Sequence, residues 1–185
     1  MSATELVSGD QYVYGDYFKM DVKQLEDGVY TFIQTGEAGM VLPWRYRCGE
    51  IEVCLLSQKR ADTFGKETLK VGGGYNGNLS RNKAAHKHLK NKLGIITQNE
   101  IIWWRRCLGV GPQYNFPIDY GFVLISEEDV LSDPTLKGCV AKWKLLSEAC
   151  EMATAQETYF FDDLSATCLF IMLINHNKIE VMTKL

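Results

Sequence analysis

The segment from Leu69 to Ile95 constrains the fold of this chain more than any other. Gly72-Gly73-Gly74 follow a short β-rich stretch, and a helix with regular apolar spacing follows the glycines. The apolar positions of this helix are Ala84, Ala85, Leu89 and Leu93, with Ser80 at the expected N-cap and Gly94 at the expected C-terminal end. This spacing is typical of a helix with one buried face. The segment therefore predicts a strand, a glycine-rich loop and a half-buried helix in succession.

The rest of the chain alternates between strand-like and helix-like segments. The expected strands are Val29–Gln34, Ile51–Ser57, Glu67–Val71, Glu100–Leu108 and Tyr120–Ile125, and the further expected helices are Val140–Met152 and Glu157–Asn175. This alternation predicts an α/β fold, an α+β sandwich in which helices flank a mixed β-sheet. Residues 1–25, rich in Tyr, Asp and Gly, are expected to form an N-terminal arm, and residues 26–185 a single domain.

The composition is typical of a globular domain. Hydrophobic residues make up 46% and charged residues 23% of the chain, which argues against extended disorder. The formal net charge is -3, so a nucleic-acid partner would need a local basic patch. The longest apolar run, Cys168–Ile174, is far shorter than the roughly 20 residues of a membrane span. We therefore expect no membrane partner.

The six cysteines are scattered and contain no CxxC pair. Without a basic and then apolar N-terminal pattern typical of secretion, scattered cysteines are more typical of reduced, buried thiols than of a disulfide framework. The sequence therefore predicts a protein of the cytoplasm or the nucleus.

The central segment resembles the Nudix box. From Gly73 to Gly94 its glycines and the apolar residue Leu89 follow the spacing of the family pattern, G-x5-E-x7-R-E-U-x-E-E-x-G-U. The stretch Cys48–Lys59 resembles the strand that precedes the box, and the likeness extends from about Trp44 to the end of the chain. The resemblance implies a Nudix-like mixed β-sheet flanked by helices. It also implies kinship with enzymes whose box glutamates bind divalent cations that bridge a diphosphate.

The acidic residues of that pattern are replaced in this chain. The positions of Glu, Arg, Glu, Glu and Glu are occupied by Leu79, Lys87, His88, Asn91 and Lys92. Magnesium requires oxygen ligands, usually including carboxylates. An ammonium group about 4 Å from the ion would add about 4 kcal/mol of repulsion at an effective dielectric constant near 20. We therefore expect no metal cofactor, no catalytic residue in the box, and a Nudix-like protein without hydrolase activity.

The replacement makes the central helix strongly basic. Between Arg81 and Lys92 there are five Lys or Arg residues, two histidines and no acidic residue. Ammonium groups in place of a metal would hold the phosphate of RNA, a nucleotide or another phosphorylated ligand without cleaving it. The residues expected to bind it are Lys83, Lys87, His88, Asn91 and Lys92, together with the backbone of Gly73 and Gly74. A solvated basic helix and a plain tight turn are the simpler alternatives.

Two consecutive tryptophans, Trp103 and Trp104, lie in an expected strand, so their rings point to opposite faces. One ring is expected to pack in the core. Trp104, with Arg105, is a candidate for stacking a base or for a protein interface. Core packing alone is the alternative interpretation.

Two other functions are compatible with the sequence. An atypical magnesium-dependent nucleoside-diphosphate hydrolase would use relocated carboxylates, for which Glu67, Glu127 and Glu128 are the candidates. An acidic turn at a helix N-terminus is the simpler explanation of the last two. A protein-protein scaffold with a vestigial pocket would bind a partner protein, or a second copy of itself, as a subunit of a larger complex. His86 and His88 diverge by about 200° on a helix and predict no shared metal.

Overall fold

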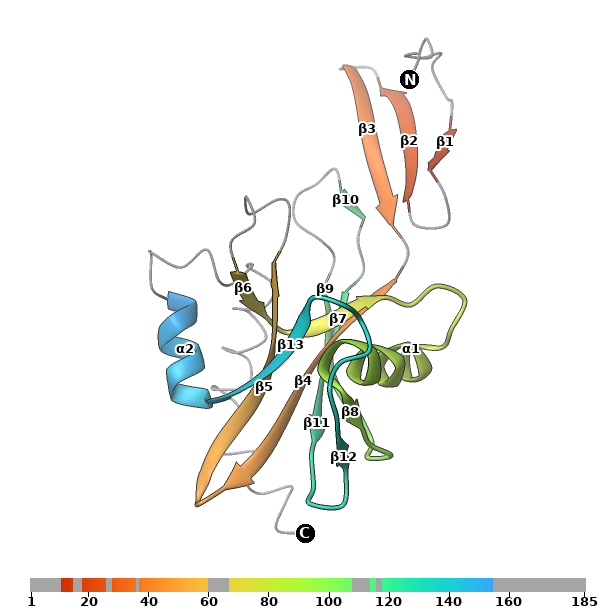
Figure 1. Ribbon diagram of the computed structural model, residues 1–185. Helices are drawn as coiled ribbons and strands as arrows, with labels where there is room; N and C mark the ends of the chain where they lie inside the picture. The colour runs from red at the N-terminus through yellow and green to blue at the C-terminus, as the bar shows by residue number, and fades with distance from the viewer. Residues whose placement is uncertain are drawn as a thin grey trace.

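In a computed structural model of the protein, the described residues are 11–14, 18–25, 28–35, 37–59, 67–107, 114–115 and 118–154. The strands before the first helix are β1 (Gln11–Tyr14), β2 (Phe18–Leu25), β3 (Gly28–Thr35), β4 (Ala38–Arg47), β5 (Glu50–Lys59), β6 (Glu67–Lys70) and β7 (Gly72–Tyr75) (Figure 1). There follow α1 (Arg81–His88), the π-helix η3 (Leu89–Leu93), β8 (Ile95–Ile96), β9 (Ile102–Cys107), β10 (Tyr114–Asn115), β11 (Ile118–Leu124), β12 (Val130–Leu131), β13 (Cys139–Leu145) and α2 (Leu146–Thr154). The expected helix Glu157–Asn175 lies outside the described residues.

The largest sheet has seven strands in the order β13-β5-β4-β11-β9, with β6 paired to β5 and β7 paired to β4. Strands β4 and β11 run parallel, while β11 and β9, like β4 and β5, run antiparallel. The sheet is therefore mixed, and with the two helices it confirms the expected α+β class. In the part of the chain that the structure describes, no helix is long and apolar enough to cross a membrane.

The β4–β5 hairpin opens away from its turn, and the chain of β6 and β7 fills the gap. Close to the turn, residues 44–47 of β4 pair with β5. Further away, residues 38–41 of β4 pair with β7, and residues 56–59 of β5 pair with β6. Only Val71 separates β6 from β7. One stretch of chain thus bridges two diverging strands and ends beside the first residues of β4.

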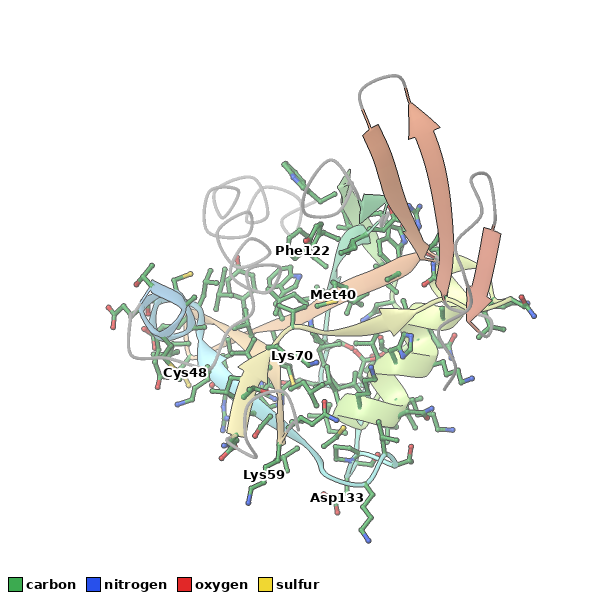
Figure 2. The ribbon with its side chains drawn as sticks, turned by 90° about the horizontal axis from the view of Figure 1, so that it is seen from above. Met40, Cys48, Lys59, Lys70, Phe122 and Asp133 are labelled. Atoms are coloured by element: carbon green, nitrogen blue, oxygen red, sulfur yellow. The ribbon has the colours of Figure 1, made fainter. Side chains whose placement is uncertain are left out.

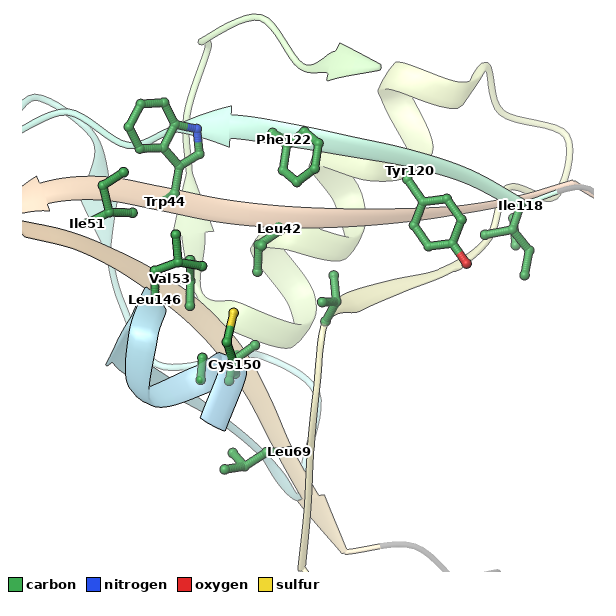
Figure 3. Packing of buried hydrophobic residues seen from close by; sticks show 14 residues of the cluster. Leu42, Trp44, Ile51, Val53, Leu69, Ile118, Tyr120, Phe122, Leu146 and Cys150 are labelled. Carbon is green, nitrogen blue, oxygen red and sulfur yellow. The ribbon is translucent and has the colours of Figure 1, made fainter. Parts of the chain in front are cut away.

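The large sheet has a hydrophobic core on each face. One core contains Leu42, Trp44, Val53, Leu55, Tyr120 and Phe122 and is covered by Leu146, Ala149 and Cys150 of α2 (Figure 3). The other contains Val41, Cys54, Leu56 and Val123 and is covered by Ala85, Leu89 and Leu93 of α1 and η3. Neighbours such as Val41 and Leu42 enter opposite cores because strand side chains alternate. The two helices accordingly lie apart, with strands between them (Figures 1 and 2).

The central helix is confirmed, with one unexpected turn. It begins at Arg81, and the Ser80 side chain makes no capping hydrogen bond with the described residues. At Leu89 the helix widens into η3, whose i→i+5 turn holds one residue more than an α-helical turn. It ends at Gly94, which has a φ of +67°. The apolar spacing of four residues fits either kind of turn, so the sequence alone does not predict the widening.

The three glycines form part of strand β7, and the expected glycine-rich loop was wrong at this point. A Cβ on Gly73 would overlap the carbonyl oxygen of Gly39 and lie 2.8 Å from the Cα of Met40. A Cβ on Gly72 would lie 2.9 Å from Cδ1 of Leu93. The glycines are needed because β4 and η3 approach this strand so closely, as is common for glycine inside a sheet.

The expected helix Val140–Met152 was wrong in its first half. Strand β13 pairs with β5 over residues 139–145, and the helix α2 begins only at Leu146. Val140, expected on the buried helix face, is 51% exposed. Pairing with β5 satisfies the backbone groups of this segment at the sheet edge, so tertiary contact overrides the local apolar spacing.

The N-terminal strands form a small sheet in the order β1-β2-β3-β10. Strands β2 and β3 are an antiparallel hairpin in which Leu25 pairs with Gly28. The boundary expected between residues 25 and 26 therefore falls inside this hairpin.

We expect Gly94→Ala to destabilise the protein strongly. The positive φ alone costs an L-residue about 1–2 kcal/mol, and the added Cβ would also overlap the carbonyl oxygen of Ser132. A urea titration should show a loss of more than about 3 kcal/mol in the free energy of unfolding. Gly138→Ala is the matched control, because Gly138 has a φ of +83° but no described atom within 4 Å of an added Cβ. Equal losses in the two variants would contradict the role of the Ser132 contact.

Candidate functional site

A cavity of about 330 Å³ lies between the end of β7, the following turn and the helix α1–η3. Its lining residues are Gly74, Asn76, Gly77, Asn78, Leu79, Ala84, Lys87, His88 and Lys92. Two lysines and a histidine thus face the cavity, and the described lining contains no acidic residue. The cavity is a concave, locally cationic site on a chain whose formal net charge is -3.

The basic side chains are positioned by the contact of η3 with β7. The Lys92 ammonium donates a hydrogen bond to the carbonyl oxygen of Gly73, which holds this charge at the cavity wall. A Cβ on Gly74 would lie 2.8 Å from Cε1 of His88 and 3.1 Å from Nζ of Lys92. Because Gly74 has no side chain, these two groups can approach the strand at the cavity.

A tight turn forms the opposite wall. The backbone amide of Asn76 donates to the Glu37 carbonyl at 2.8 Å, and the amide of Leu79 donates to the Asn76 carbonyl at 3.1 Å. Gly77, the first central residue of this turn, has a φ of +59°, as is typical of a type II′ turn. The turn is therefore fixed by its own backbone and by the end of the β3–β4 connection.

The side chain of Asn76 is buried and makes no hydrogen bond with the described residues. Asn76 is only 5% exposed, and neither its amide nitrogen nor its amide oxygen has a partner among the residues that the structure describes. Its Oδ1 lies 3.6 Å from the point where a Cβ on Gly39 would stand, and Cη2 of Trp103 lies 3.2 Å from that same point. An unpaired polar group with such apolar neighbours costs free energy.

The first turn of α1 is fastened to the sheet by Trp103 on β9. The Arg81 guanidinium lies 4.5 Å above the Trp103 ring and 3.4 Å from the buried carboxylate of Asp119. The indole nitrogen of Trp103 donates to Oδ1 of Asn82 at 2.6 Å. Asp119 therefore offsets the charge of Arg81. The sequence gives one hint of this arrangement, since one of the two tryptophans is expected to pack inward.

The structure brings together four of the residues expected to bind a ligand. Gly74, Lys87, His88 and Lys92 line the cavity, and Leu79, at the first box position, lines it as well. Gly73 takes part through its carbonyl group, which accepts the Lys92 hydrogen bond. These residues, expected to bind a ligand, thus lie around one cavity, and their role in binding stays a prediction.

Two of the expected ligand residues lie elsewhere. Lys83 is exposed and does not line the cavity. Oδ1 of Asn91 accepts a hydrogen bond from the Thr135 hydroxyl at 3.2 Å, and its carbonyl accepts one from the Leu136 amide at 2.8 Å. The wider turn of η3 directs Asn91 to the loop before β13, so its role is to anchor that loop.

Trp104 and Arg105 lie on β9, and Trp104 is not part of the cavity lining. Trp104 is 44% exposed, whereas Trp103 packs partly buried against the core that α1 covers. One of the two tryptophans therefore packs inward, as expected, and the other is exposed. Arg105 pairs with Tyr120 of β11 through the backbone, and its side chain is outside the described atoms.

Glu67, a candidate for a relocated metal site, is held by hydrogen bonds to neighbouring strands. Lys142 and Ser57 both donate hydrogen bonds to its carboxylate. The bond from Lys142, followed by the bond from Ser57, lowers the pKa of Glu67. This exposed carboxylate joins β6, β5 and β13 and does not line the cavity.

Glu127 and Glu128 are exposed in the turn after β11. The neighbouring Asp129 accepts a hydrogen bond from the Ser126 amide at 2.8 Å and one from Nδ2 of Asn99 at 3.1 Å, so it stabilises an acidic turn. Within the described ranges, no three His, Cys, Asp or Glu side chains form a group that could hold a metal ion. The structure therefore does not bring the three candidate glutamates together.

Four cysteines among the described residues are free thiols. Cys54, Cys139 and Cys150 are buried, and Cys48 is exposed in the β4–β5 turn. Burial raises the pKa of the Cys54 thiol to about 12 and also raises the pKa of Cys150. The thiols of Cys54 and Cys150 therefore remain protonated at neutral pH.

A comparison with protein-family models finds no family that matches the chain, and a comparison with curated proteins finds no match either. The likeness to the Nudix box therefore stays a prediction, and the interpretation of the site depends on its geometry.

We expect Lys142→Met to raise the pKa of Glu67 toward its ordinary value, because the first cause of its lowering is removed. A lowered pKa in the folded state stabilises the protein above the ordinary pKa of glutamate, and this contribution is lost as the pH falls through the lowered value. An NMR titration of the Glu67 carboxyl carbon measures the shift. Lys144→Met is the matched control, because the Lys144 ammonium pairs with Glu148 instead. An unchanged Glu67 titration in Lys142→Met would contradict the assignment.

Proposed function

We propose that this protein binds a small phosphorylated ligand, of the size of a nucleotide, in the cavity between β7 and the helix α1–η3. The observation that carries the proposal is the cavity lining, in which Lys87, His88 and Lys92 are the charged or titratable groups. These three side chains would donate hydrogen bonds to phosphate oxygens, and charge-assisted bonds of this kind are about twice as strong as neutral ones.

The size of the cavity favours a small ligand over an RNA strand. Its volume of about 330 Å³ lies at the lower end of the range of roughly 300–1,000 Å³ for small-molecule sites. A nucleotide or a phosphorylated sugar would occupy such a space, whereas an RNA strand would need a longer basic groove. Trp104, the side chain suggested for base stacking, is not part of the lining. RNA binding is therefore the competing hypothesis, and the binding experiments described below distinguish it from the binding of a small ligand.

Binding without hydrolysis is the second part of the proposal. Lys92 donates a hydrogen bond to the Gly73 carbonyl, so an ammonium group is held at this wall of the cavity. Positive charge on the protein itself would neutralise phosphate without a metal cofactor. In the Nudix interpretation this is a catalytically inactive member of the superfamily. The hydrolase alternative would need Glu67, Glu127 or Glu128 at the cavity, and none of them lines it.

The proposal leaves room for assembly with other proteins. If the chain binds a partner protein or a second copy of itself, it would be a subunit of a larger complex and would contribute the ligand cavity to it. The buried reduced thiols favour the cytoplasm or the nucleus as the place of action.

We expect Lys87→Glu to weaken the binding of ADP by at least about tenfold, because a charge-assisted hydrogen bond is lost and a repulsive charge is added. Isothermal titration calorimetry measures the dissociation constant, which should also rise with added NaCl. Lys90→Glu is the matched control, since Lys90 is exposed on the same helix and does not line the cavity.

The same titration is repeated with magnesium and with EDTA. The proposal expects binding in EDTA and no release of inorganic phosphate under either condition. Equal weakening by Lys87→Glu and Lys90→Glu would indicate only a nonspecific basic helix. Magnesium-dependent cleavage of ADP would favour the hydrolase alternative, and tight binding of a short RNA with no binding of ADP would favour an RNA-binding surface.

A further inference from the structure

The unpaired amide of Asn76 is the feature of the cavity that phosphate binding leaves unexplained. Asn76 lines the cavity, is 5% exposed, and has an amide nitrogen and oxygen without partners among the described residues. The large majority of buried side-chain polar atoms are hydrogen-bonded, because an unpaired one costs free energy. Such a group at a ligand cavity therefore points to a partner that the ligand supplies.

The described contacts of the fold do not require this amide group. The backbone of Asn76 is fixed by its bonds to Glu37 and Leu79, and those bonds would form with any residue other than proline. Its Oδ1 and the ring of Trp103 both lie close to Gly39, and an apolar side chain of similar size would fill this buried place without an unpaired polar group. The turn alone would therefore be more stable with leucine than with asparagine at this position.

Resting on the proposed function, we propose that Asn76 selects phosphorylated ligands that carry a sugar hydroxyl group. A hydroxyl both donates and accepts a hydrogen bond, so it satisfies the amide oxygen and the amide nitrogen together. A bare phosphate group offers mainly acceptors and would leave the amide oxygen unpaired. The ligand class is therefore phosphorylated sugars, nucleotides included, in preference to inorganic phosphate or simple phosphate esters.

The amide must turn to reach the ligand. Its atoms are covered in the cavity wall, and the broad terminal torsion of asparagine allows the amide to reorient toward a ligand. In this arrangement the lysines bind the phosphate group, and Asn76 forms hydrogen bonds with the sugar attached to the phosphate. Charge and selectivity are thus assigned to different residues, which makes them separable by mutation.

The test uses Asn76→Leu with two probes, ribose 5-phosphate and methyl phosphate. Both are phosphate monoesters, but only the first carries sugar hydroxyls. NMR titration of the full chain measures both dissociation constants, and a thermal melt measures stability without ligand. We expect the wild type to prefer ribose 5-phosphate by about tenfold. The variant should lose this preference, bind methyl phosphate as before, and melt about 2–4 °C higher because the unpaired amide is gone.

Each other result decides against a specific claim. If the wild type binds neither probe, the proposed function fails and this inference fails with it. If both probes bind and Asn76→Leu keeps the preference for ribose 5-phosphate, the phosphate site stands and the role of Asn76 is overturned. A lower melting temperature in Asn76→Leu, together with an unchanged preference in Asn76→Ala, would show that the amide serves the fold.

Discussion

The structure depends on the divergence of strands β4 and β5. Their hairpin is paired only near its turn, and beyond residues 44–47 the backbone of β4 needs another partner. The chain of β6 and β7 supplies it, and β7 lies so close to the backbone of β4 that Gly73 admits no side chain, while a side chain on Gly72 would displace Leu93 of η3. This crowded contact places the helix α1–η3 over one face of the sheet and opens the cavity at the end of β7.

A basic helix and a basic site are different things in this protein. The sequence contains five Lys or Arg residues between positions 81 and 92, but the structure uses them differently. Arg81 is offset by Asp119, Lys83 and Lys90 are exposed outside the cavity, and only Lys87 and Lys92 line it with His88. The number of basic residues in the sequence therefore overestimates the charge at the cavity. The packing of the helix against β7 determines which basic side chains line it.

Local patterns predicted the parts that depend on local physics. The buried face of the central helix and its terminal Gly94 followed from spacing and from the conformation that glycine favours. Strand β13 and the strand character of β7 were missed, because both exist through pairing with strands that are distant in sequence. The buried amide of Asn76 and the Asp119–Arg81 pair were missed for the same reason, since burial and partners are properties of the folded chain.

The π-helical turn makes this cavity sensitive to chain length. η3 holds one residue more than an α-helical turn, so loss of a single codon between Leu89 and Leu93 would let the helix close into regular geometry. Because the narrower turn takes up the loss, residues beyond the deletion would keep their direction around the helix axis, and only the widened turn itself would change. The contact between Lys92 and the Gly73 carbonyl lies on that turn, so the length of η3 is a direct constraint on the position of this one charge at the cavity wall.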